Sequence, residues 1–341
     1  MYAYQEPRVR FRKIRDIGQE GRNSSVYIIH DGNLDATLAI KEVEKGSGYF
    51  HPRYFEEAQI LYKSAHPNVV QVLYACEDDD NVYVATPYYQ NGSLKSYMAN
   101  RFLTVREIIQ FSCQFLNGLH NVHSKGLYHF DIKPDNILLS DRYEALLSDF
   151  GQSREIDENG LAMQPRQYNK IVAPEFFGNN YLDSRSDIYQ AGLTLYHMCV
   201  GTAEFDSQIA QFATVRDLGH AKRTENFPDF EKYPLHIPDK LKRVIKKSLR
   251  ATPQNRYQSV LEMVNALADI DGPILDWQYE IDNGTHKWHQ LTDDGYVKRL
   301  TVCPERTSLA QKFKEGSGER RVTAYCLDNI TDERIGDFLN L

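Results

Sequence analysis

The chain has few cysteines and no stretch that could cross a membrane. Its five cysteines, among 341 residues, form no Cys-x-x-Cys pair. An odd number with scattered spacing argues against a disulfide framework and is typical of a reducing compartment. No run of 18 apolar residues occurs, and the start of the chain lacks the apolar segment of a signal peptide. We therefore expect a cytoplasmic protein with no membrane partner.

An excess of basic charge is also absent. The 40 Lys and Arg residues stand against 47 Asp and Glu, a formal net charge of −7, which argues against a nucleic-acid partner. The 41% apolar and 26% charged residues are typical of a globular protein, and the length allows one large core or two ordinary ones.

Three side chains that can hold a cation or accept a proton lie close together in the sequence, at Asp131, Asn136 and Asp149. Apolar runs at 137–139 and 145–147, on either side of a polar turn, predict two short strands that place these groups at hairpin ends. A phosphoryl-transfer site needs one carboxylate to orient a hydroxyl, and an amide oxygen with a second carboxylate to hold Mg²⁺. This spacing therefore indicates such a site.

The first part of the chain is rich in predicted strands and the second in predicted helices. β-Branched and aromatic residues between Gly, Asn and Asp clusters predict strands over 9–17, 25–30, 36–43, 69–76 and 82–87. A helix is expected over 54–64. A Thr104–Glu107 capping box opens a further helix, and later ones are expected over 186–200, 239–250 and 259–269.

Strand patterns return after Asp271-Gly272-Pro273. They are expected over 277–281, 287–291, 296–303 and 321–327. The predicted fold class is α+β, with a strand-rich lobe over 9–88, a helical lobe over 89–272 and a small α+β appendix over 273–341.

From about residue 14 to 269 the chain resembles the protein kinase family, with two lobes. The stretch 129–136 resembles the catalytic loop, and Asp149-Phe150-Gly151 resembles the metal-binding motif. The resemblance implies that Asp131 orients the substrate hydroxyl and accepts its proton, and that Asn136 and Asp149 hold Mg²⁺. It also implies that Lys133 supports the γ-phosphate, as in the Ser/Thr-specific members.

Ala39-Ile40-Lys41 resembles the strand whose lysine binds the α- and β-phosphates of ATP. The glutamate that pairs with Lys41 can be Glu56 or Glu57. Glu57 is favoured because His66-Pro67-Asn68 follows it at the spacing of the family.

Two further stretches resemble parts of the ATP site. The stretch 17–26 is similar to the Gly-rich loop, with one extra residue and with Ser24 where the third glycine is usual. In 82–94, Thr86 is the expected gatekeeper, and the Pro87 carbonyl and the Tyr89 amide face the adenine. The resemblance implies an ATP site formed by Gly18, Gly21, Ser24, Val26, Ala39, Lys41, Thr86, Pro87, Tyr89 and Leu138.

The chain departs from the family at Phe130, where arginine is usual. That arginine meets a phosphate on the activation loop, so we expect activity that does not depend on activation-loop phosphorylation. Residues 167–172 also lack the Gly-Thr that Ser/Thr kinases show before Ala173, which leaves tyrosine open as an acceptor.

The resemblance predicts a protein kinase that transfers the γ-phosphoryl group of MgATP to Ser or Thr of a protein substrate. A small-molecule phosphotransferase of kinase-like fold is a first alternative, although Ala173-Pro174-Glu175 and Arg256, which the family pairs, favour a protein substrate. A catalytically inactive scaffold is the second.

The appendix carries aromatic and basic residues with no assigned role. Trp277, Tyr279, Ile281 and Trp288 alternate on two expected strands, and we expect this face to dock on the helical lobe or on a second chain. Its basic residues can bind an acidic partner; they are Lys298, Arg299, Arg306, Lys312, Lys314, Arg320 and Arg321.

Overall fold

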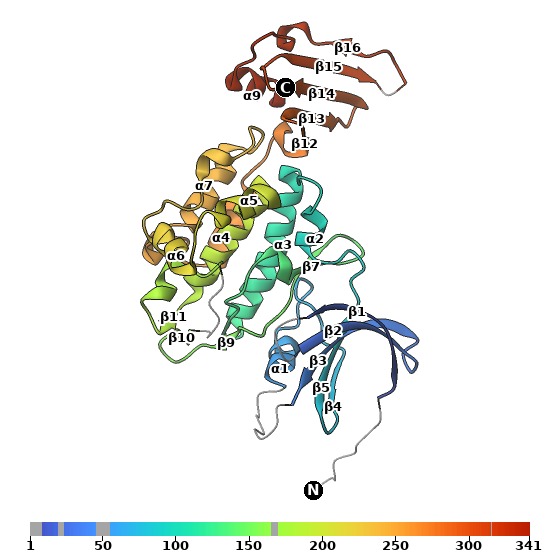
Figure 1. Ribbon diagram of the computed structural model, residues 1–341, viewed down its shortest axis with the longest axis vertical. Helices are drawn as coiled ribbons and strands as arrows, with labels where there is room; N and C mark the ends of the chain where they lie inside the picture. Colours follow the sequence, from blue (N-terminus) through green and yellow to red (C-terminus); the bar gives the residue numbers. More distant parts are fainter. Residues whose placement is uncertain (1–8, 20–23, 46–54, 165–169, 315) are drawn as a thin grey trace.

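The computed structural model describes residues 9–19, 24–45, 55–164, 170–314 and 316–341. They form a strand-rich lobe, a helical lobe and a C-terminal appendix in succession along the long axis of the molecule (Figure 1). This arrangement confirms the predicted fold class. Among the predicted site residues, Gly21 lies outside the described residues. No helix in the described part is both long and apolar enough to span a bilayer.

The first lobe is a five-stranded antiparallel sheet in the order β1-β2-β3-β5-β4. Its strands are β1 (Phe11–Gln19), β2 (Ser24–Asp31), β3 (Ala36–Glu44), β4 (Tyr74–Glu77) and β5 (Asn81–Pro87). Helix α1 (Glu56–Lys63), which lies within the helix predicted over 54–64, buries Ala58, Ile60 and Leu61.

The strand expected over 69–76 is wrong for most of its length, because only β4 is extended in the sheet. Val69 and Val70 are buried instead against the second lobe, where Val69 makes a single bridge to Leu147 and the Val70 amide donates to the Leu147 carbonyl at 2.9 Å. The β-branched residues here serve packing between the lobes, which composition does not distinguish from a strand.

The second lobe is built on helices around one core. Its helices are α2 (Leu94–Met98), α3 (Val105–Ser124), α4 (Ser184–Val200), α5 (Thr202–Ala210), α6 (Val215–Arg223), α7 (Asp239–Ser248) and α8 (Val260–Ala268). The predicted capping box opens α3: the Glu107 amide donates to Thr104 Oγ1 at 3.1 Å, and the Thr104 amide donates to Glu107 Oε2 at 2.8 Å. Helices α2, α5 and α6 were not predicted.

Short strand pairs hold the loops of this lobe. The hairpin predicted around residue 142 is confirmed as β7 (Ile137–Leu139) and β8 (Ala145–Leu147). The other pairs are β6 (Leu127–Tyr128) with β9 (Arg154–Glu155), and β10 (Ala162–Met163) with β11 (Tyr181–Leu182). Short 3₁₀ helices include η1 (Pro134–Asn136) and η2 (Pro174–Phe177).

The appendix is a second antiparallel sheet closed by one helix. It contains β12 (Gln278–Asp282), β13 (Thr285–Leu291), β14 (Tyr296–Val302), β15 (Ser308–Lys314), β16 (Arg320–Arg321) and α9 (Asp332–Leu339). The strand expected over 321–327 is wrong. After β16 the chain turns into a 3₁₀ helix, Thr323–Tyr325, and the neighbour of β14 is β15, which was not predicted.

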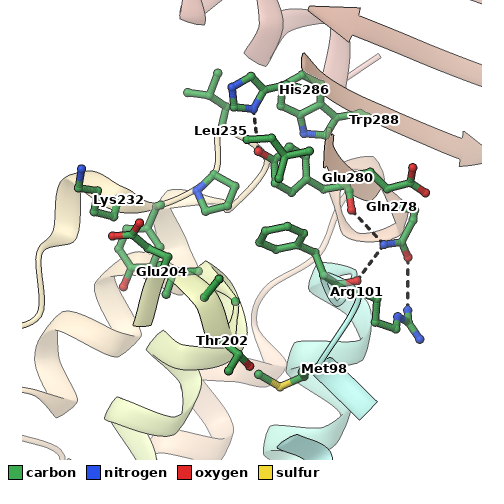
Figure 2. Close-up of a pocket in the computed structure, with 18 of the residues that line it drawn as sticks. Met98, Arg101, Thr202, Glu204, Lys232, Leu235, Gln278, Glu280, His286 and Trp288 are labelled. Carbon is green, nitrogen blue, oxygen red and sulfur yellow. Dashed lines mark hydrogen bonds between the residues drawn. The ribbon is translucent and has the colours of Figure 1, made fainter. Parts of the chain in front are cut away.

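The appendix packs on the helical lobe. Trp288 Nε1 donates to His236 Nδ1 at 3.3 Å, Gln278 Nε2 donates to the Phe102 carbonyl at 2.8 Å, and Phe102 meets the Tyr279 ring edge-on at 4.7 Å. The expected docking of the aromatic face on the large lobe is therefore present, although Ile281 remains 49% exposed. A groove of about 1040 Å³ remains beside this contact (Figure 2).

Candidate active site

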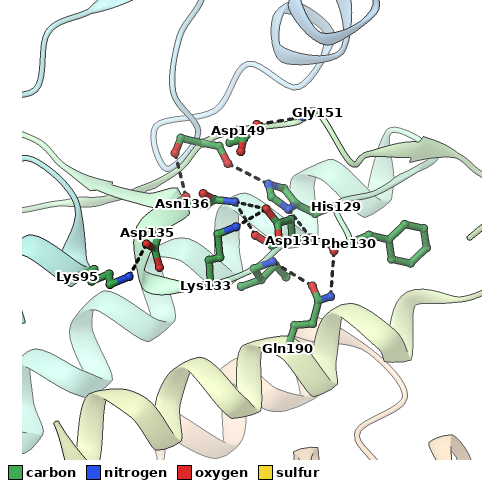
Figure 3. Close-up of polar contacts among 12 residues, drawn as sticks. Lys95, His129, Phe130, Asp131, Lys133, Asp135, Asn136, Asp149, Gly151 and Gln190 are labelled. Carbon is green, nitrogen blue, oxygen red and sulfur yellow. Dashed lines mark hydrogen bonds and ion pairs between the residues drawn. The ribbon is translucent and has the colours of Figure 1, made fainter. Parts of the chain in front are cut away.

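The residues predicted for phosphoryl transfer converge between the two lobes (Figure 3). Asp131 is almost fully buried. Its Oδ2 accepts hydrogen bonds from Lys133 Nζ and from Asn136 Nδ2, both at 2.7 Å. Asn136 Nδ2 also donates to the Asp131 carbonyl at 2.8 Å. The Asn136 amide is therefore oriented with its nitrogen toward Asp131.

The remaining oxygen of that amide and the carboxylate of Asp149 fit a magnesium ion. Asn136 Oδ1 accepts no hydrogen bond from the described residues, and amide and carboxylate oxygens are ligands that Mg²⁺ prefers. No group of three or more His, Cys, Asp or Glu in the described part could hold a metal by itself. An ion held here would complete its octahedral shell with phosphate oxygens and water.

Asp149 is kept ionised by its neighbours. Burial would raise the pKa of its carboxyl, but Lys41, whose Nζ lies 3.4 Å from Oδ1, and the Gly151 amide, 3.3 Å from the same oxygen, lower it below the ordinary value. Asp149 has a backbone φ of +56°, a conformation that side chains other than glycine seldom adopt. The charged form is the one that binds a cation.

Lys41 joins the sheet of the first lobe to helix α1. It lies on β3, and its Nζ lies 3.0 Å from both carboxylate oxygens of Glu57. The expected pairing of Lys41 with Glu57 is present. The two side chains are only 20% exposed, so solvent screens this pair less than a surface pair.

Helix α4 holds the backbone of the catalytic loop. Asp187, fully buried, accepts hydrogen bonds from the amides of His129 at 2.9 Å and Phe130 at 2.7 Å. Gln190 bonds the Phe130 carbonyl at 2.9 Å and the Ile132 amide at 3.0 Å. Sequence reasoning missed these positioning roles.

His129 is neutral and fixed in one tautomer. Burial lowers its pKa below the ordinary value, against the opposing effect of nearby carboxylates. The Asp131 amide points at Nδ1 at 3.3 Å, so the proton belongs on Nε2, which lies 3.1 Å from the Ser148 carbonyl. The ring also meets Phe150 edge-on at 4.7 Å, which ties the catalytic loop to the Asp149 segment.

A cavity of about 360 Å³ opens from these groups toward the strand β5. Seven of the ten predicted ATP-site residues line it: Val26, Ala39, Lys41, Thr86, Pro87, Tyr89 and Leu138. Gly18 and Ser24 lie on β1 and β2 beside the described edge of the Gly-rich loop. Sequence reasoning missed several apolar residues that line the cavity, because they occupy ordinary positions of predicted strands and of a predicted helix. They include Ile17, Leu61, Val70 and Val84.

Residues 11–267 match the family model described as the protein kinase domain. The chain belongs to the protein kinase family. This kinase is 27% identical to a probable serine/threonine-protein kinase of Clostridium perfringens over 76% of its length, and 26% identical to PrkC of Bacillus subtilis over 91%. It is 27% identical to the probable kinase PknB of Lactococcus lactis over 76%. It spans only 38%, 47% and 42% of these relatives, respectively.

The end of the activation segment, which we define as residues 149–175, is held by a buried ion pair. Arg256 binds Glu175 through two hydrogen bonds of 2.8 and 2.7 Å. The expected pair is therefore present. Its guanidinium also donates to the carbonyls of Arg185, Arg250 and Ala251, so its charge is well compensated although its side chain is buried.

Phe130 replaces the usual arginine with an apolar contact. Its ring is 2% exposed and packs in one cluster with residues of the activation segment and its surroundings. The other buried members of this cluster are Tyr128, Ala162, Val172, Phe176 and Leu182. The kinase therefore stabilises this part of the segment by apolar burial.

Proposed function

We propose that the protein transfers the γ-phosphoryl group of MgATP to serine or threonine hydroxyls of protein substrates, with tyrosine as a further acceptor to be tested. The observation that carries this is the convergence of Asp131, Lys133 and Asn136 with Asp149, which lines the nucleotide cavity together with Lys41 (Figure 3). These are the groups that phosphoryl transfer requires.

Each side chain has a distinct part in the proposed reaction. Asp131 orients the hydroxyl, whose oxygen attacks the γ-phosphorus while the bond to the ADP oxygen breaks, and it takes the proton of that hydroxyl. Lys133 lies beside Asp131 and stabilises the negative charge of the transferred phosphoryl group. Lys41, positioned by Glu57, binds the non-transferred phosphates. Asn136 and Asp149 would hold Mg²⁺, which when bound neutralises charge on the phosphate oxygens.

The arrangement supports an active protein kinase over the two alternatives. The Lys41–Glu57 pair is closed, which an inactive scaffold would not need. The Arg256–Glu175 pair fixes the outer part of the activation segment, where a protein substrate would lie. Three units are proposed: residues 9–88 and 89–272 as the two kinase lobes, and 273–341 as the appendix, which lies outside the matched kinase region.

The proposed compartment and partners follow from the cysteines and from the charges of the appendix. All five cysteines are free, which suits a cytoplasmic location. On the appendix, Lys312 and Lys314 lie over the Tyr296 ring at 4.7 and 5.0 Å, next to Lys298. Lys298 has a lowered pKa because of burial and of Lys312. Such a cluster would suit an acidic partner.

The test is phosphoryl transfer from labelled ATP to casein and to the protein itself. Asp149→Ala is expected to abolish transfer at every MgATP concentration while leaving the thermal unfolding temperature close to that of the wild type. Lys41→Ala should recover more of its rate than Asp149→Ala at saturating MgATP, because it weakens nucleotide binding. Transfer by Asp149→Ala within about tenfold of the wild-type rate would contradict the proposal.

A further inference from the structure

A polar hollow lies beside the end of the activation segment, on the surface of the helical lobe. Its volume is about 400 Å³, and Gln164, Phe177, Asn179, Asn180, Arg216 and Arg223 contribute to its lining. No acidic side chain is among the residues that line it. It is separate from the nucleotide cavity, with which it shares no lining residue.

Helix α6 builds one wall of this hollow by a close approach to η2. A Cβ added at Gly219 would lie only 2.4 Å from the Phe177 ring, so glycine is needed for the helix to approach this closely. Arg216, Gly219 and Arg223 are spaced by three and four residues, which puts them on one face of α6. The Arg223 guanidinium lies over the Phe177 ring at 5.5 Å.

The buried face of α6 is tied to the activation segment. Lys222, which is 1% exposed, donates from Nζ to the carbonyls of Lys170 at 2.7 Å and Val172 at 2.9 Å. Val172 belongs to the same apolar cluster as Phe130, which precedes Asp131. The hollow, the activation segment and the catalytic loop are thus parts of one packed unit.

No described acidic side chain compensates the positive charges of the hollow. Arg216 and Arg223 make no ion pair within the described residues, whereas Arg185 and Arg250 of the same lobe pair with Asp183 and Glu225. The side-chain amides of Asn179 and Asn180 likewise bond to no described residue, and both residues are exposed. Two guanidinium groups and two amides around one hollow match an anion with several oxygens.

We propose that this hollow, which we call the arginine pocket, binds an anionic side chain of the protein substrate and so selects acidic or phosphorylated sequences near the acceptor hydroxyl. This inference rests on the proposed kinase function, because it concerns the substrate of that reaction. The arginine pocket borders η2 at the end of the activation segment, on which the proposed protein substrate would lie. Glutamate, aspartate and phosphoserine share the required chemistry.

The test compares serine peptides that differ only in one residue, placed in turn at each position near the acceptor. Glutamate, phosphoserine, glutamine and lysine are compared, so that carboxylate and phosphate are distinguished. At one or more positions, the wild type is expected to show a KM about 5- to 20-fold lower for the anionic peptides, since each charge-assisted contact contributes modestly at an exposed site. The kcat should change by less than about twofold.

Two variants and one control identify the pocket. Arg216→Gln with Arg223→Gln should remove the preference, and Arg216→Glu with Arg223→Glu should reverse it in favour of lysine. Arg243→Glu, a charge reversal at an exposed position of α7, is the matched control and should leave the preference unchanged. The proposal would be overturned if the wild type showed equal KM values for all four peptides at every position. It would also be overturned if the Gln and Glu variants kept the wild-type preference for anionic peptides.

A binding measurement separates this inference from the kinase function. Fluorescence anisotropy of a labelled acidic peptide needs no turnover and can be recorded with Asp149→Ala. Binding that is lost on adding the two Arg→Gln changes supports the arginine pocket even if no peptide is phosphorylated. Binding that the Arg→Gln changes leave unaltered rejects the arginine pocket, whether or not the kinase is active.

Discussion

At the scale of single residues, Phe130 shows how an apolar side chain can take a position that the family usually gives to a cation. Its backbone is left-handed, with φ of +62°. The hydrogen bonds from its amide to Asp187 and from Gln190 to its carbonyl hold this conformation. Its ring packs in one cluster with Val172 of the activation segment and with Phe176, which follows that segment, so an apolar contact stands where the family usually has a phosphate-binding arginine.

We therefore predict that phosphatase treatment leaves the transfer rate within about twofold of that of the untreated protein.

Phe130→Ala should lower the free energy of unfolding by about 3–5 kcal/mol, as for other buried phenylalanines. It should also lower kcat, because the activation segment loses its packing. Urea unfolding and steady-state rates measure these effects. A large loss of activity after phosphatase, recovered by preincubation with MgATP, would show that a phosphate has a role that Phe130 does not replace.

The sequence pointed to the proposed reacting groups but not to the groups that position them. Asp131, Asn136 and Asp149 lie within nineteen positions, and their local spacing predicts a phosphoryl-transfer site. Asp187 is 57 residues beyond Phe130 in the chain, and a buried aspartate has no local signature of its own. Only the fold brings such residues together.

At the scale of elements, helix α4 is the support on which the catalytic loop is fixed. Asp187, Gln190 and Thr194 follow at intervals of three and four residues on one face, and all three bond to the backbone of residues 129–132. On another face, a Cβ at Gly192 would lie 2.5 Å from Ser248 of α7. The helix is therefore fixed from both sides.

We predict that Asp187→Asn lowers kcat about 10- to 100-fold with little change in the KM for ATP. The substituted amide would leave one loop N–H without its acceptor, at a cost of about 1–3 kcal/mol. Asp183→Asn is the matched control, because Asp183 caps the same helix but does not contact the loop. Equal kcat values for Asp187→Asn and the control would contradict this role of α4.

Helix α6 is hydrogen-bonded to the activation segment through Lys222, a buried side chain that can titrate. Burial lowers the pKa of Lys222 to about 7, from an ordinary value of 10.5, against the opposing effect of Glu175. The unfolded chain therefore binds a proton that the folded protein releases between these two values. The stability that Lys222 contributes is complete above pH 10.5 and is lost as pH falls toward 7.

We predict that the unfolding free energy of the wild type, relative to Lys222→Met, rises between pH 7 and 10 by at most about 1.4 kcal/mol per pH unit. Below pH 6.5 the difference should be constant. Urea titrations of both proteins at several pH values measure it. Parallel stability curves from pH 6.5 to 9.5 would mean that the lysine is charged in the folded protein.

At the scale of the whole molecule, the appendix and the helical lobe share one core. Trp277, Tyr279 and Trp288 belong to the same buried cluster as α3 and α4. The alternation of these aromatic residues predicted an apolar face that must pack against another surface. The residues of that surface could not be predicted, because Phe102 and His236 come from a loop and a turn of the helical lobe with no periodic pattern.

We predict that a protein ending at Gly272 loses solubility or self-associates, although it keeps every proposed catalytic group. Removal of the appendix would expose Phe102 and His236 and would take away Asp276, which pairs with Arg106. Sedimentation and transfer assays on the fragment and on the full chain compare the two. A monomeric fragment with full activity on all substrates would make the appendix an independent module.

The contact between His236 and Trp288 should make docking of the appendix sensitive to acid. Because Nδ1 of His236 accepts the Trp288 hydrogen bond, the neutral ring carries its proton on Nε2. Burial, with a smaller effect of Lys242, lowers the pKa of His236 to about 3. The unfolded value is about 6.5, so the stability from this group is complete above pH 6.5 and is lost as pH falls toward 3.

Both tryptophans of the chain lie in the appendix and are buried, so their fluorescence reports its docking. We predict a red shift of the emission as pH falls from 6 to 4, at a higher pH than loss of helical circular dichroism, because the appendix contact is weakened first. His236→Gln keeps an acceptor for Trp288 without a titrating ring, and it should move the fluorescence transition to lower pH. Identical transitions in the two proteins would show that other groups control acid release of the appendix.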